Sequence, residues 1–241
     1  MSATDVATAE IPGSARWWMD RERRLARRRP RADGLSIERI ITTAVALVDR
    51  EGLEALTVRR LADDLETGSA SLYRHFASRD ELLVLMVDHV LGEIVFPPPD
   101  SPGRNKVEVL SGELRRVLMD HAKLLPALTA SPLLGPNAMR GAENGLANLL
   151  DAGFVPEAAV PAYLALIDYV LGTVYFDTSS AGRAPSGERN SADLIAALPA
   201  EAFPTLRAHE AAFALPTVDE VFGFGLTTFL DGLEHRFPPL R

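Results

Sequence analysis

The stretch TVRRLADDLETGSASLYRHF, residues 57–76, decides the fold of this chain. In its first half apolar residues recur at i, i+3, i+4 and i+7, and Thr57 stands where an N-cap is expected, which predicts a short helix packed on a core. Glu66-Thr67-Gly68 interrupts this pattern. After the interruption, Leu72 and Phe76 have the spacing of inward-facing residues on a second short helix. The stretch therefore predicts two helices joined by a turn.

The second helix carries hydrogen-bonding side chains on its outer face. Ser69 or Ser71 is placed to cap it, and the outer face consists of Ser71, Tyr73, Arg74 and His75. Such donors suit phosphate oxygens and base edges, and a helix of this size fits the major groove of DNA. We interpret the stretch as a DNA-reading helix-turn-helix. The alternative is that Tyr73 and His75 are ordinary surface residues of a helical hairpin.

Three ordered segments carry a family resemblance: LTVRRLA at 56–62, SLYRHF at 71–76 and SRDELL at 78–83. Together they resemble the TetR family of transcriptional repressors, and the resemblance covers residues 36–96. More loosely, FGFGL at 222–226 and LDGLE at 230–234 resemble the tetracycline-repressor-like branch of C-terminal domains. The resemblance implies a dimeric, effector-responsive DNA-binding protein.

By this resemblance, DNA-contacting positions are matched by Arg59, Ser71, Tyr73 and His75. Arg79 matches a phosphate-binding lysine. With neighbouring side chains and the N-terminal arginines, the expected DNA-binding residues are Arg59, Ser69, Ser71, Tyr73, Arg74, His75, Arg79, Arg27, Arg28 and Arg29. The chain departs from the family in its turn, where Leu65-Glu66-Thr67 replaces Leu-Gly-Val and removes a glycine suited to a left-handed conformation. Arginine at position 79 keeps the charge of lysine but changes the contact geometry.

Length and composition limit the classes of protein to which this chain can belong. The chain has 241 residues and 47% apolar content, enough for one large or two small domains with a core. It has no cysteine, so disulfides and thiolate metal sites are excluded, and a reducing cytoplasm fits this composition. The sequence shows neither 18 consecutive apolar residues nor a signal peptide. We expect a cytoplasmic protein with no membrane partner.

Charge is unevenly divided along the chain. Residues 1–36 carry a net charge of +3, residues 37–92 of −4 and residues 93–241 of −7. Eight arginines fall between positions 16 and 31, so we expect residues 1–35 to form a flexible basic arm that follows phosphates or enters the minor groove. A solvated tail is the alternative. The pair Trp17-Trp18 more often docks on the body of a protein than stacks on bases.

The remaining segments are helical in pattern. A first helix is expected at Ser36–Arg50, and Ser78 with Glu81 forms a capping box that opens a long helix ending before Pro97. Further helices are expected near 105–125, 136–152, 156–178 and 218–236. The predicted fold is all-α, with a three-helix helix-turn-helix DNA-binding domain and its connecting helix at 36–96. A helical ligand-binding and dimerisation domain is predicted at 104–241.

Two of these helices, 156–178 and 218–236, are apolar around more than one face. A two-fold dimer in which they form a four-helix bundle would bury the second face, as the family resemblance also implies. The alternative is burial inside one subunit. The expected dimerisation residues are Ile167, Leu171, Val174, Phe222, Leu226 and Phe229.

Polar residues within the apolar C-terminal part are the only indication of a ligand site in the sequence. They would orient a mostly hydrophobic small-molecule effector, or they are exposed or satisfied internally. The candidates, together with a histidine of the connecting helix, are His89, His121, Asn144, Asn148, Tyr163 and Asp168. Histidines of tetracycline-type relatives help to hold a drug-magnesium complex, but neither His89 nor His121 matches those positions securely, so no metal or cofactor is predicted.

An enzyme is disfavoured because the sequence lacks HExxH, GxSxG, a phosphate loop and a cysteine nucleophile. The prediction is a ligand-responsive transcriptional regulator, most readily a repressor released from a palindromic operator. Two alternatives stay open at this point: an activator on the same fold, and a small-molecule-binding or partner-binding helical protein that has lost DNA binding.

Overall fold

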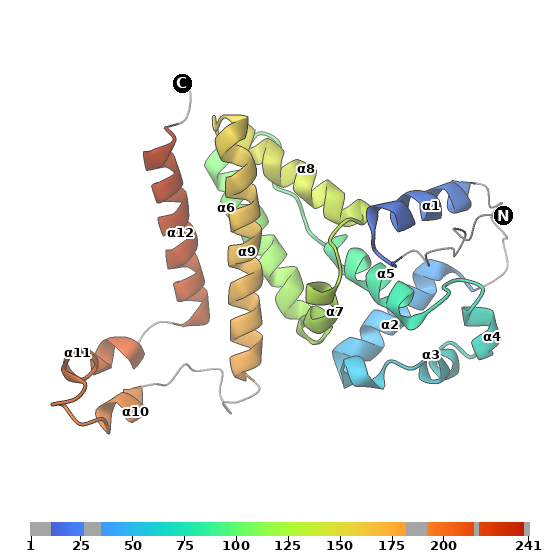
Figure 1. The fold of residues 1–241 in the computed structure, drawn as a ribbon, viewed down its shortest axis with the longest axis horizontal. Helices are drawn as coiled ribbons and strands as arrows, with labels where there is room; N and C mark the ends of the chain where they lie inside the picture. Colours follow the sequence, from blue (N-terminus) through green and yellow to red (C-terminus); the bar gives the residue numbers. More distant parts are fainter. Residues whose placement is uncertain (1–10, 27–34, 182–191, 215–216, 239–241) are drawn as a thin grey trace, which may run out of the picture. The chain divides into compact units, whose positions relative to one another are not determined.

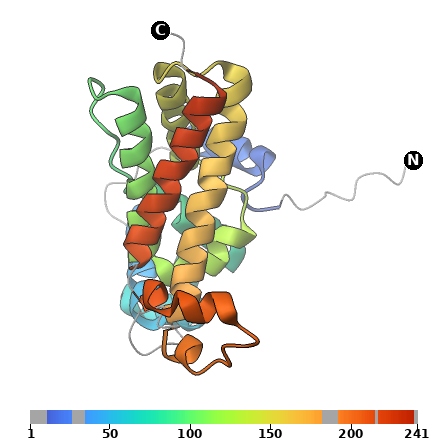
Figure 2. The ribbon, with the colours of Figure 1, turned by 90° about the vertical axis from the view of Figure 1, so that its left-hand side faces the viewer.

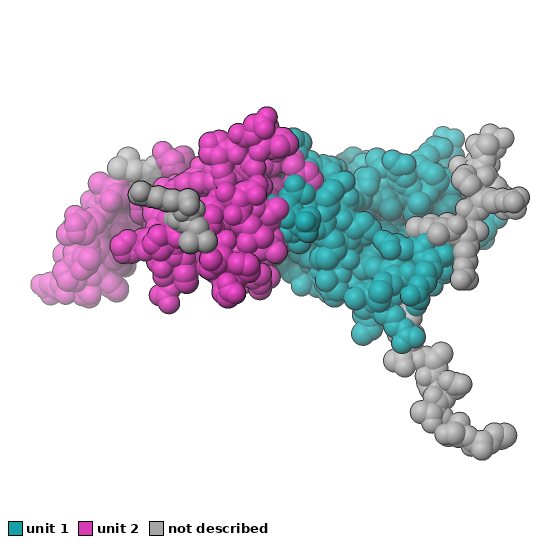
Figure 3. Space-filling view, turned by 90° about the horizontal axis from the view of Figure 1, so that it is seen from above, with its two compact units in different colours: residues 1–95, 116–144 teal, residues 96–115, 145–241 magenta. Residues whose placement is uncertain are grey.

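The computed structural model describes residues 11–26, 35–181, 192–214 and 217–238. All regular elements in these ranges are helical, which confirms the predicted all-α class (Figure 1). The chain divides into two compact units, residues 1–95 with 116–144 and residues 96–115 with 145–241, which are coloured separately in Figure 3. Helices α6 (Gly103–Asp120) and α8 (Pro136–Asp151) contribute residues to both units.

The first unit contains the helix-turn-helix. Its elements are α2 (Ile37–Glu51), η1 (Leu53–Ala55), α3 (Val58–Asp64), α4 (Ser69–Leu72) and α5 (Arg79–Leu91). The predicted caps are confirmed for α2 and α3, where the hydroxyls of Ser36 and Thr57 accept from the N–H groups of Arg39 and Arg60. Fully buried side chains hold these helices together: Ile40, Leu47, Leu61, Leu72, Phe76 and Met86. Burial of each large side chain stabilises the unit by about 1.5–3 kcal/mol.

Only half of the predicted capping box of α5 forms. Ser78 Oγ accepts from the N–H of Glu81 at 3.1 Å. The Glu81 carboxylate bonds the N–H of Ala77 at 2.8 Å, one residue earlier than a capping box requires, and it also accepts from Arg21 at 2.9 Å. The second acceptor oxygen of Glu81 is thus committed to an arginine from the N-terminal segment.

The N-terminal segment differs from the expected flexible arm, because residues Ala15–Ala26 form helix α1. Trp17 and Trp18 are only 5% and 8% exposed, so the expected docking of this pair on the body is confirmed. Arg21 packs over the Trp17 ring and pairs with buried Glu81. Flexibility was the wrong prediction for this helix because two buried indoles and a paired arginine outweigh its polar composition. Arg27, Arg28 and Arg29 lie outside the described residues.

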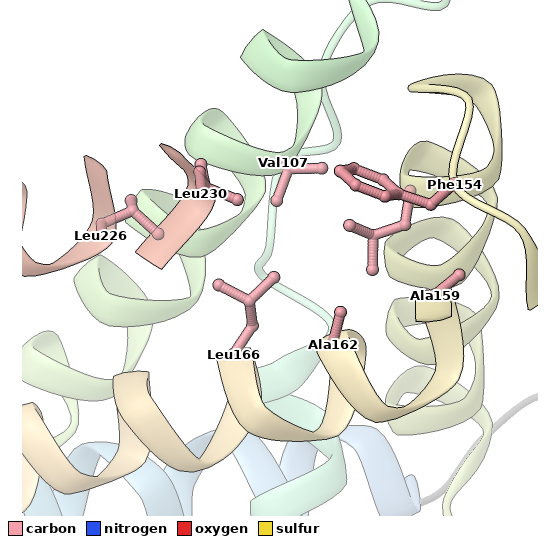
Figure 4. Close-up of a cluster of buried hydrophobic side chains, with 8 residues drawn as sticks. Val107, Phe154, Ala159, Ala162, Leu166, Leu226 and Leu230 are labelled. Atoms are coloured by element: carbon pink, nitrogen blue, oxygen red, sulfur yellow. The ribbon is translucent and has the colours of Figure 1, made fainter. Parts of the chain in front are cut away.

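In the second unit, α9 (Pro156–Ala181) and α12 (Val218–Arg236) pack beside each other (Figures 1 and 2). A buried cluster joins them to α6 and α8: Val107, Leu149, Phe154, Ala159, Ala162, Leu166, Leu226 and Leu230 (Figure 4). The expected helix 105–125 is broken after Asp120, and η2 (Ala122–Leu124) and α7 (Leu125–Ala130) follow it. Short elements complete the described chain: α10 (Ala192–Ala196), α11 (Pro204–Ala208) and η3 (Glu210–Ala214).

Candidate DNA interface and effector cavity

The turn between α3 and α4 keeps its left-handed residue without a glycine. Glu66 has φ 51°, the only positive φ of a non-glycine residue in the described ranges. The N–H of Glu66 donates to Asp63 O at 3.1 Å and that of Thr67 to Ala62 O at 2.9 Å, which is the bond pattern of a Schellman motif. Because a side chain in this conformation costs about 1–2 kcal/mol, the turn is strained but correctly formed.

The reading helix α4 is a single turn that begins differently from the prediction. Its N-cap is Gly68, which makes no side-chain bond, so neither Ser69 nor Ser71 caps the helix. Gly68 already takes the extended conformation of an N-cap residue, with ψ 144°, so both serines lie within helix α4 itself. The hydroxyl of Ser71 instead accepts from Arg74 Nη2 at 2.8 Å.

The inward face of this segment is as predicted, whereas on the predicted outer face Tyr73 and Arg74 are exposed and Ser71 and His75 are half-buried. Leu72 and Phe76 are 0% and 2% exposed, whereas Tyr73 is 54% exposed. The Tyr73 ring lies 6.1 Å from the ring of Phe76, which orients it without burying its hydroxyl. Arg74 is exposed and His75 is half-buried. A phenol, a guanidinium and an imidazole are thus held on one turn by two buried anchors.

Neighbouring arginines on α3 have different environments. Arg60 pairs with Glu51 at 3.0 Å and with Asp64 at 3.2 Å. Arg59 is exposed, and its side chain makes no hydrogen bond or ion pair within the described part of the chain. The charge of Arg59 is therefore available to a phosphate, whereas that of Arg60 is largely compensated.

Arg79 fixes the backbone before the motif. Its Nε donates to Leu56 O at 3.3 Å and its Nη2 to Leu53 O at 3.0 Å, so one guanidinium bonds two carbonyls of the η1 segment. The planar fork of arginine makes both bonds at once, which the single ammonium of lysine does less readily. These two bonds give a structural reason for arginine in place of lysine at position 79. They leave Nη1 of Arg79 for a phosphate.

A cavity of about 330 Å³, including its solvent-open part, lies within the second unit. It is lined by residues of α6, α8 and α9: Val107, Leu110, Ser111, Leu114, Gly145, Tyr163, Leu166, Ile167 and Val170. The lining is mostly apolar, as it is in small-molecule sites. Ser111 Oγ is already bonded to Val107 O at 2.8 Å.

Besides Ser111, Tyr163 is the polar residue that lines this cavity. Its hydroxyl makes no hydrogen bond among the described residues, and burial raises the pKa of the phenol, which keeps it a neutral donor. Gly145 gives the ring its place, because a Cβ at this position would lie 2.7 Å from Tyr163 Cε2. A methyl group at residue 145 would therefore push the phenol ring.

Of the six predicted effector residues, only Tyr163 lines the cavity. His121 bonds Asp49 at 2.8 Å and Glu93 at 3.1 Å, and Asn144 donates to Arg140 O at 2.9 Å, so both are satisfied internally. Asp168 is exposed and His89 is half-buried. Asn148 is 7% exposed and its Nδ2 has no partner among the described residues.

The predicted dimerisation residues also separate. Val174 and Leu226 are 0% and 6% exposed, so the alternative of burial within one subunit holds for them. Ile167 lines the cavity, and Leu171, Phe222 and Phe229 are half-buried. Other apolar side chains of α9 and α12 are more exposed than these predicted residues: Val160, Leu164, Tyr175, Phe176 and Phe224. These residues were missed because apolar periodicity cannot tell the two faces of such a helix apart.

Two sequence profiles match this chain. The profile of bacterial regulatory proteins of the tetR family matches residues 40–86, and that of the tetracyclin repressor-like C-terminal domain matches residues 97–237. The chain belongs to the TetR family. Members of this family regulate transcription without enzymatic activity, so the predicted regulator class is confirmed.

Individual relatives place the chain within the TetR family. It is 32% identical over 213 residues to the HTH-type transcriptional repressor DrrR1 of Streptomyces coeruleorubidus, covering 83% of this chain and 77% of that repressor. An HTH-type transcriptional regulator of Saccharopolyspora erythraea is 38% identical over 141 residues, 58% of this chain and 60% of that protein. The crystal structure of the TetR family protein ActR of Streptomyces coelicolor with actinorhodin has a TM-score of 0.75 at 34% identity, covering 85% and 97%.

Proposed function

We propose that this TetR-family protein is a dimeric repressor that binds a palindromic operator and releases it when a small, mostly apolar effector enters the cavity. The observation that carries the proposal is the outer face of the reading segment. Tyr73 and Arg59 are exposed and contribute little to packing or ion pairing, while Leu72 and Phe76 hold the segment rigidly. Rigid, outward donors are what base and phosphate contacts require.

A second copy of the chain is needed because one short reading helix gives a small interface. The exposed apolar side chains of α9 and α12 support a dimer, since Leu164 is 55% and Phe224 76% exposed. By length and composition alone, Pro156–Thr178 would also suit a membrane span, but core helices of soluble proteins meet the same criteria. Within its most apolar stretch of 18 residues, 28% is buried. A four-helix bundle, in which the α9–α12 pair of a second subunit covers these exposed apolar side chains, accounts for the apolar surface.

The dimer is testable by sizing. The variant Leu164→Arg places a charge in the proposed seam and should be monomeric at concentrations where the native chain is a dimer. Leu194→Arg is the matched control, because Leu194 is also exposed, at 69%, but lies on α10. Dimers in both variants would count against this interface.

The cavity defines the effector class. It would accept a largely apolar molecule with at least one acceptor for the Tyr163 hydroxyl, and Ile167 and Val170 would contact its apolar body. Actinorhodin, which is bound in the ActR structure, is a first compound to test. We propose no metal or cofactor for this site.

In this proposal residues 36–96 bind DNA, residues 104–241 bind effector and partner, and the protein acts in the cytoplasm, where bacterial operators lie. Arg27, Arg28 and Arg29 would add phosphate contacts from the segment that follows α1. Since α1 packs through Trp17 and Trp18, this is better tested by substituting these three arginines with glutamine than by deleting the N-terminus.

The experiment is a fluorescence-anisotropy titration of the native dimer with DNA from beside its own gene, repeated over a range of salt concentrations. Arg59→Ala should weaken binding and lower the salt slope by about one unit for each phosphate that this arginine neutralises. Arg60→Ala is the matched control and should change the slope less, because its charge is paired with Glu51 and Asp64. No specific binding by the native dimer would favour a ligand-binding protein that has lost its operator.

A further inference from the structure

Helix α8 is capped by a residue of another helix. The residue at its N-cap position is Gly135, which has no side chain to accept from the first N–H groups of the helix. Asp88, on α5, supplies the acceptor: its Oδ1 accepts from the N–H of Asn137 at 3.0 Å and of Ala138 at 3.1 Å. A carboxylate of α5 therefore does what Ser, Thr or Asp usually does within the same chain segment.

The Asn137 side chain adds a second set of bonds to Asp88, which we call the second arm of the contact, and no side chain fits at Gly135. Asn137 Nδ2 donates back to the backbone oxygen of Asp88 at 2.9 Å and to Asp88 Oδ2 at 3.3 Å. A Cβ at Gly135 would lie 2.1 Å from Asp88 Oδ1, so the close approach requires glycine there. Asp88 is 9% exposed. We call Asp88, Gly135, Asn137 and Ala138 the α5–α8 latch.

The same helix reaches the effector cavity further along. Gly145 lines the cavity and lies against the Tyr163 ring. Eight residues separate it from Asn137, a rise of about 12 Å in an α-helix. The helix runs from Pro136 to Asp151 without an interior proline. A displacement at Gly145 is therefore carried to the capped first turn, because backbone hydrogen bonds keep the helix stiff between them.

At its other end, α5 begins directly after the reading segment. Ser78 caps α5 two residues after buried Phe76, and Phe76 anchors the turn that carries Tyr73. A movement of α5 therefore moves the anchor of the reading face. We propose that Asp88 is a positioning residue that transmits displacement of α8 by an effector to α5, and so to the reading helix. This inference rests on the proposed function and names the bond through which it is regulated.

The test uses a substitution in place of an unidentified effector. Gly145→Ala adds a methyl that must push Tyr163, whereas Gly141→Ala, on the same helix, adds one that meets nothing within 4 Å. Both raise helix propensity equally, so Gly141→Ala is the matched control. Each is made in the native dimer and in the Asp88→Asn variant, which removes the negative charge and replaces the Oδ2 acceptor with an amide donor that faces Asn137 Nδ2. Asn137→Ala, which removes only the second arm, gives an independent background.

Two measurements are made on each variant: operator affinity by anisotropy, and hydrogen exchange of the α5 amides by mass spectrometry. Gly145→Ala should weaken operator binding by about fivefold or more, the lower end of allosteric couplings, and raise exchange in α5. In the Asp88→Asn background the effect should shrink to within about twofold, the scatter expected of independent sites. Gly141→Ala should have no effect on either quantity in either background.

Equal effects of Gly145→Ala in both backgrounds would overturn the proposal, as would no effect of Gly145→Ala in the native dimer. If the native dimer binds no operator, the proposed function fails, and the exchange measurement still decides on the latch. In that case increased α5 exchange in the native background alone supports transmission through Asp88, and equal exchange in both backgrounds overturns it.

Discussion

The reading segment and the effector cavity differ in how they are built. The reading face comes from one turn and its flanking residues, and its side chains point away from the core that supports them. The cavity is assembled from α6, α8 and α9, and its lining residues Val107 and Leu166 also belong to the buried cluster of the second unit. A site of the first kind separates function from stability, whereas a site of the second kind shares residues between them.

This difference predicts how substitutions behave. Removing an outward side chain from the reading face should cost binding and leave stability unchanged. Removing a cavity residue should change effector binding and, unless volume is conserved, stability as well. Substitutions at the two sites therefore test whether function and stability separate in this way.

The largest effect is expected from Tyr73→Ala combined with His75→Ala. If the two side chains each provide a base or phosphate contact of about 1–3 kcal/mol, operator affinity should fall by at least about 30-fold. Because Tyr73 is 54% exposed and the anchors Leu72 and Phe76 remain, the melting temperature should stay within a few degrees. Anisotropy and circular dichroism measure both quantities. Retained operator affinity would remove this segment as the reading element.

His121 provides a second test, because it was predicted as an effector residue and instead joins Asp49 of α2 to Glu93. Burial alone would lower the pKa of this imidazole, but the hydrogen bonds and charges of Glu93 and Asp49 outweigh it and raise the pKa above its usual value. With carboxylates at both ring nitrogens, the protonated ring donates two bonds. Its contribution to stability is fully present below pH 6.5 and is lost as pH rises through the raised pKa.

His121→Gln should therefore destabilise the protein most below pH 6.5 and progressively less at higher pH. A loss of about 1.5–3 kcal/mol at low pH is expected for hydrogen bonds to charged groups. Urea unfolding at several pH values measures it. A destabilisation independent of pH would show that the ring packs without being protonated, and a loss of effector affinity at constant stability would return His121 to the cavity.

The sequence predicted the reading segment well because its information is local. N-caps at Ser36 and Thr57, the buried pair Leu72 and Phe76, and the left-handed demand on residue 66 all depend on neighbours in the chain. The cavity lies in the predicted ligand-binding domain and includes Tyr163, but its other lining residues were beyond prediction, since residues such as Gly145 and Leu110 lie far apart in sequence and meet only after packing. Helix α1 was missed for the same reason: its partner Glu81 lies 60 residues away.

A smaller effect is expected from Tyr163→Phe, which conserves the volume of the cavity. The hydroxyl makes no bond among the described residues, so stability and operator binding without effector should be unchanged. Effector affinity should fall by about two- to twelvefold, the equivalent of one hydrogen bond. Isothermal titration measures this, with Tyr175→Phe as the control because Tyr175 is 52% exposed. Unchanged affinity in Tyr163→Phe would mean that the phenol does not orient the effector.

The smallest effect concerns backbone strain in the turn of the reading segment. Glu66→Gly should stabilise the protein by up to about 1 kcal/mol, because glycine takes φ 51° without a steric penalty. Glu66→Ala keeps the strain while removing the carboxylate, so it should be nearly neutral in thermal unfolding. Equal stabilisation by both variants would assign the effect to charge instead of backbone conformation.

Operator and effector are proposed to bind the same dimer antagonistically, through two sites built in these different ways. The most direct measurement titrates actinorhodin, and each compound found by thermal-shift screening, against the free dimer and against the dimer on its operator. Linkage requires the effector to bind the operator complex more weakly by the factor with which it weakens operator binding, about 5- to 150-fold. Equal affinities of every bound compound for both forms, with none displacing the operator, would contradict this antagonism.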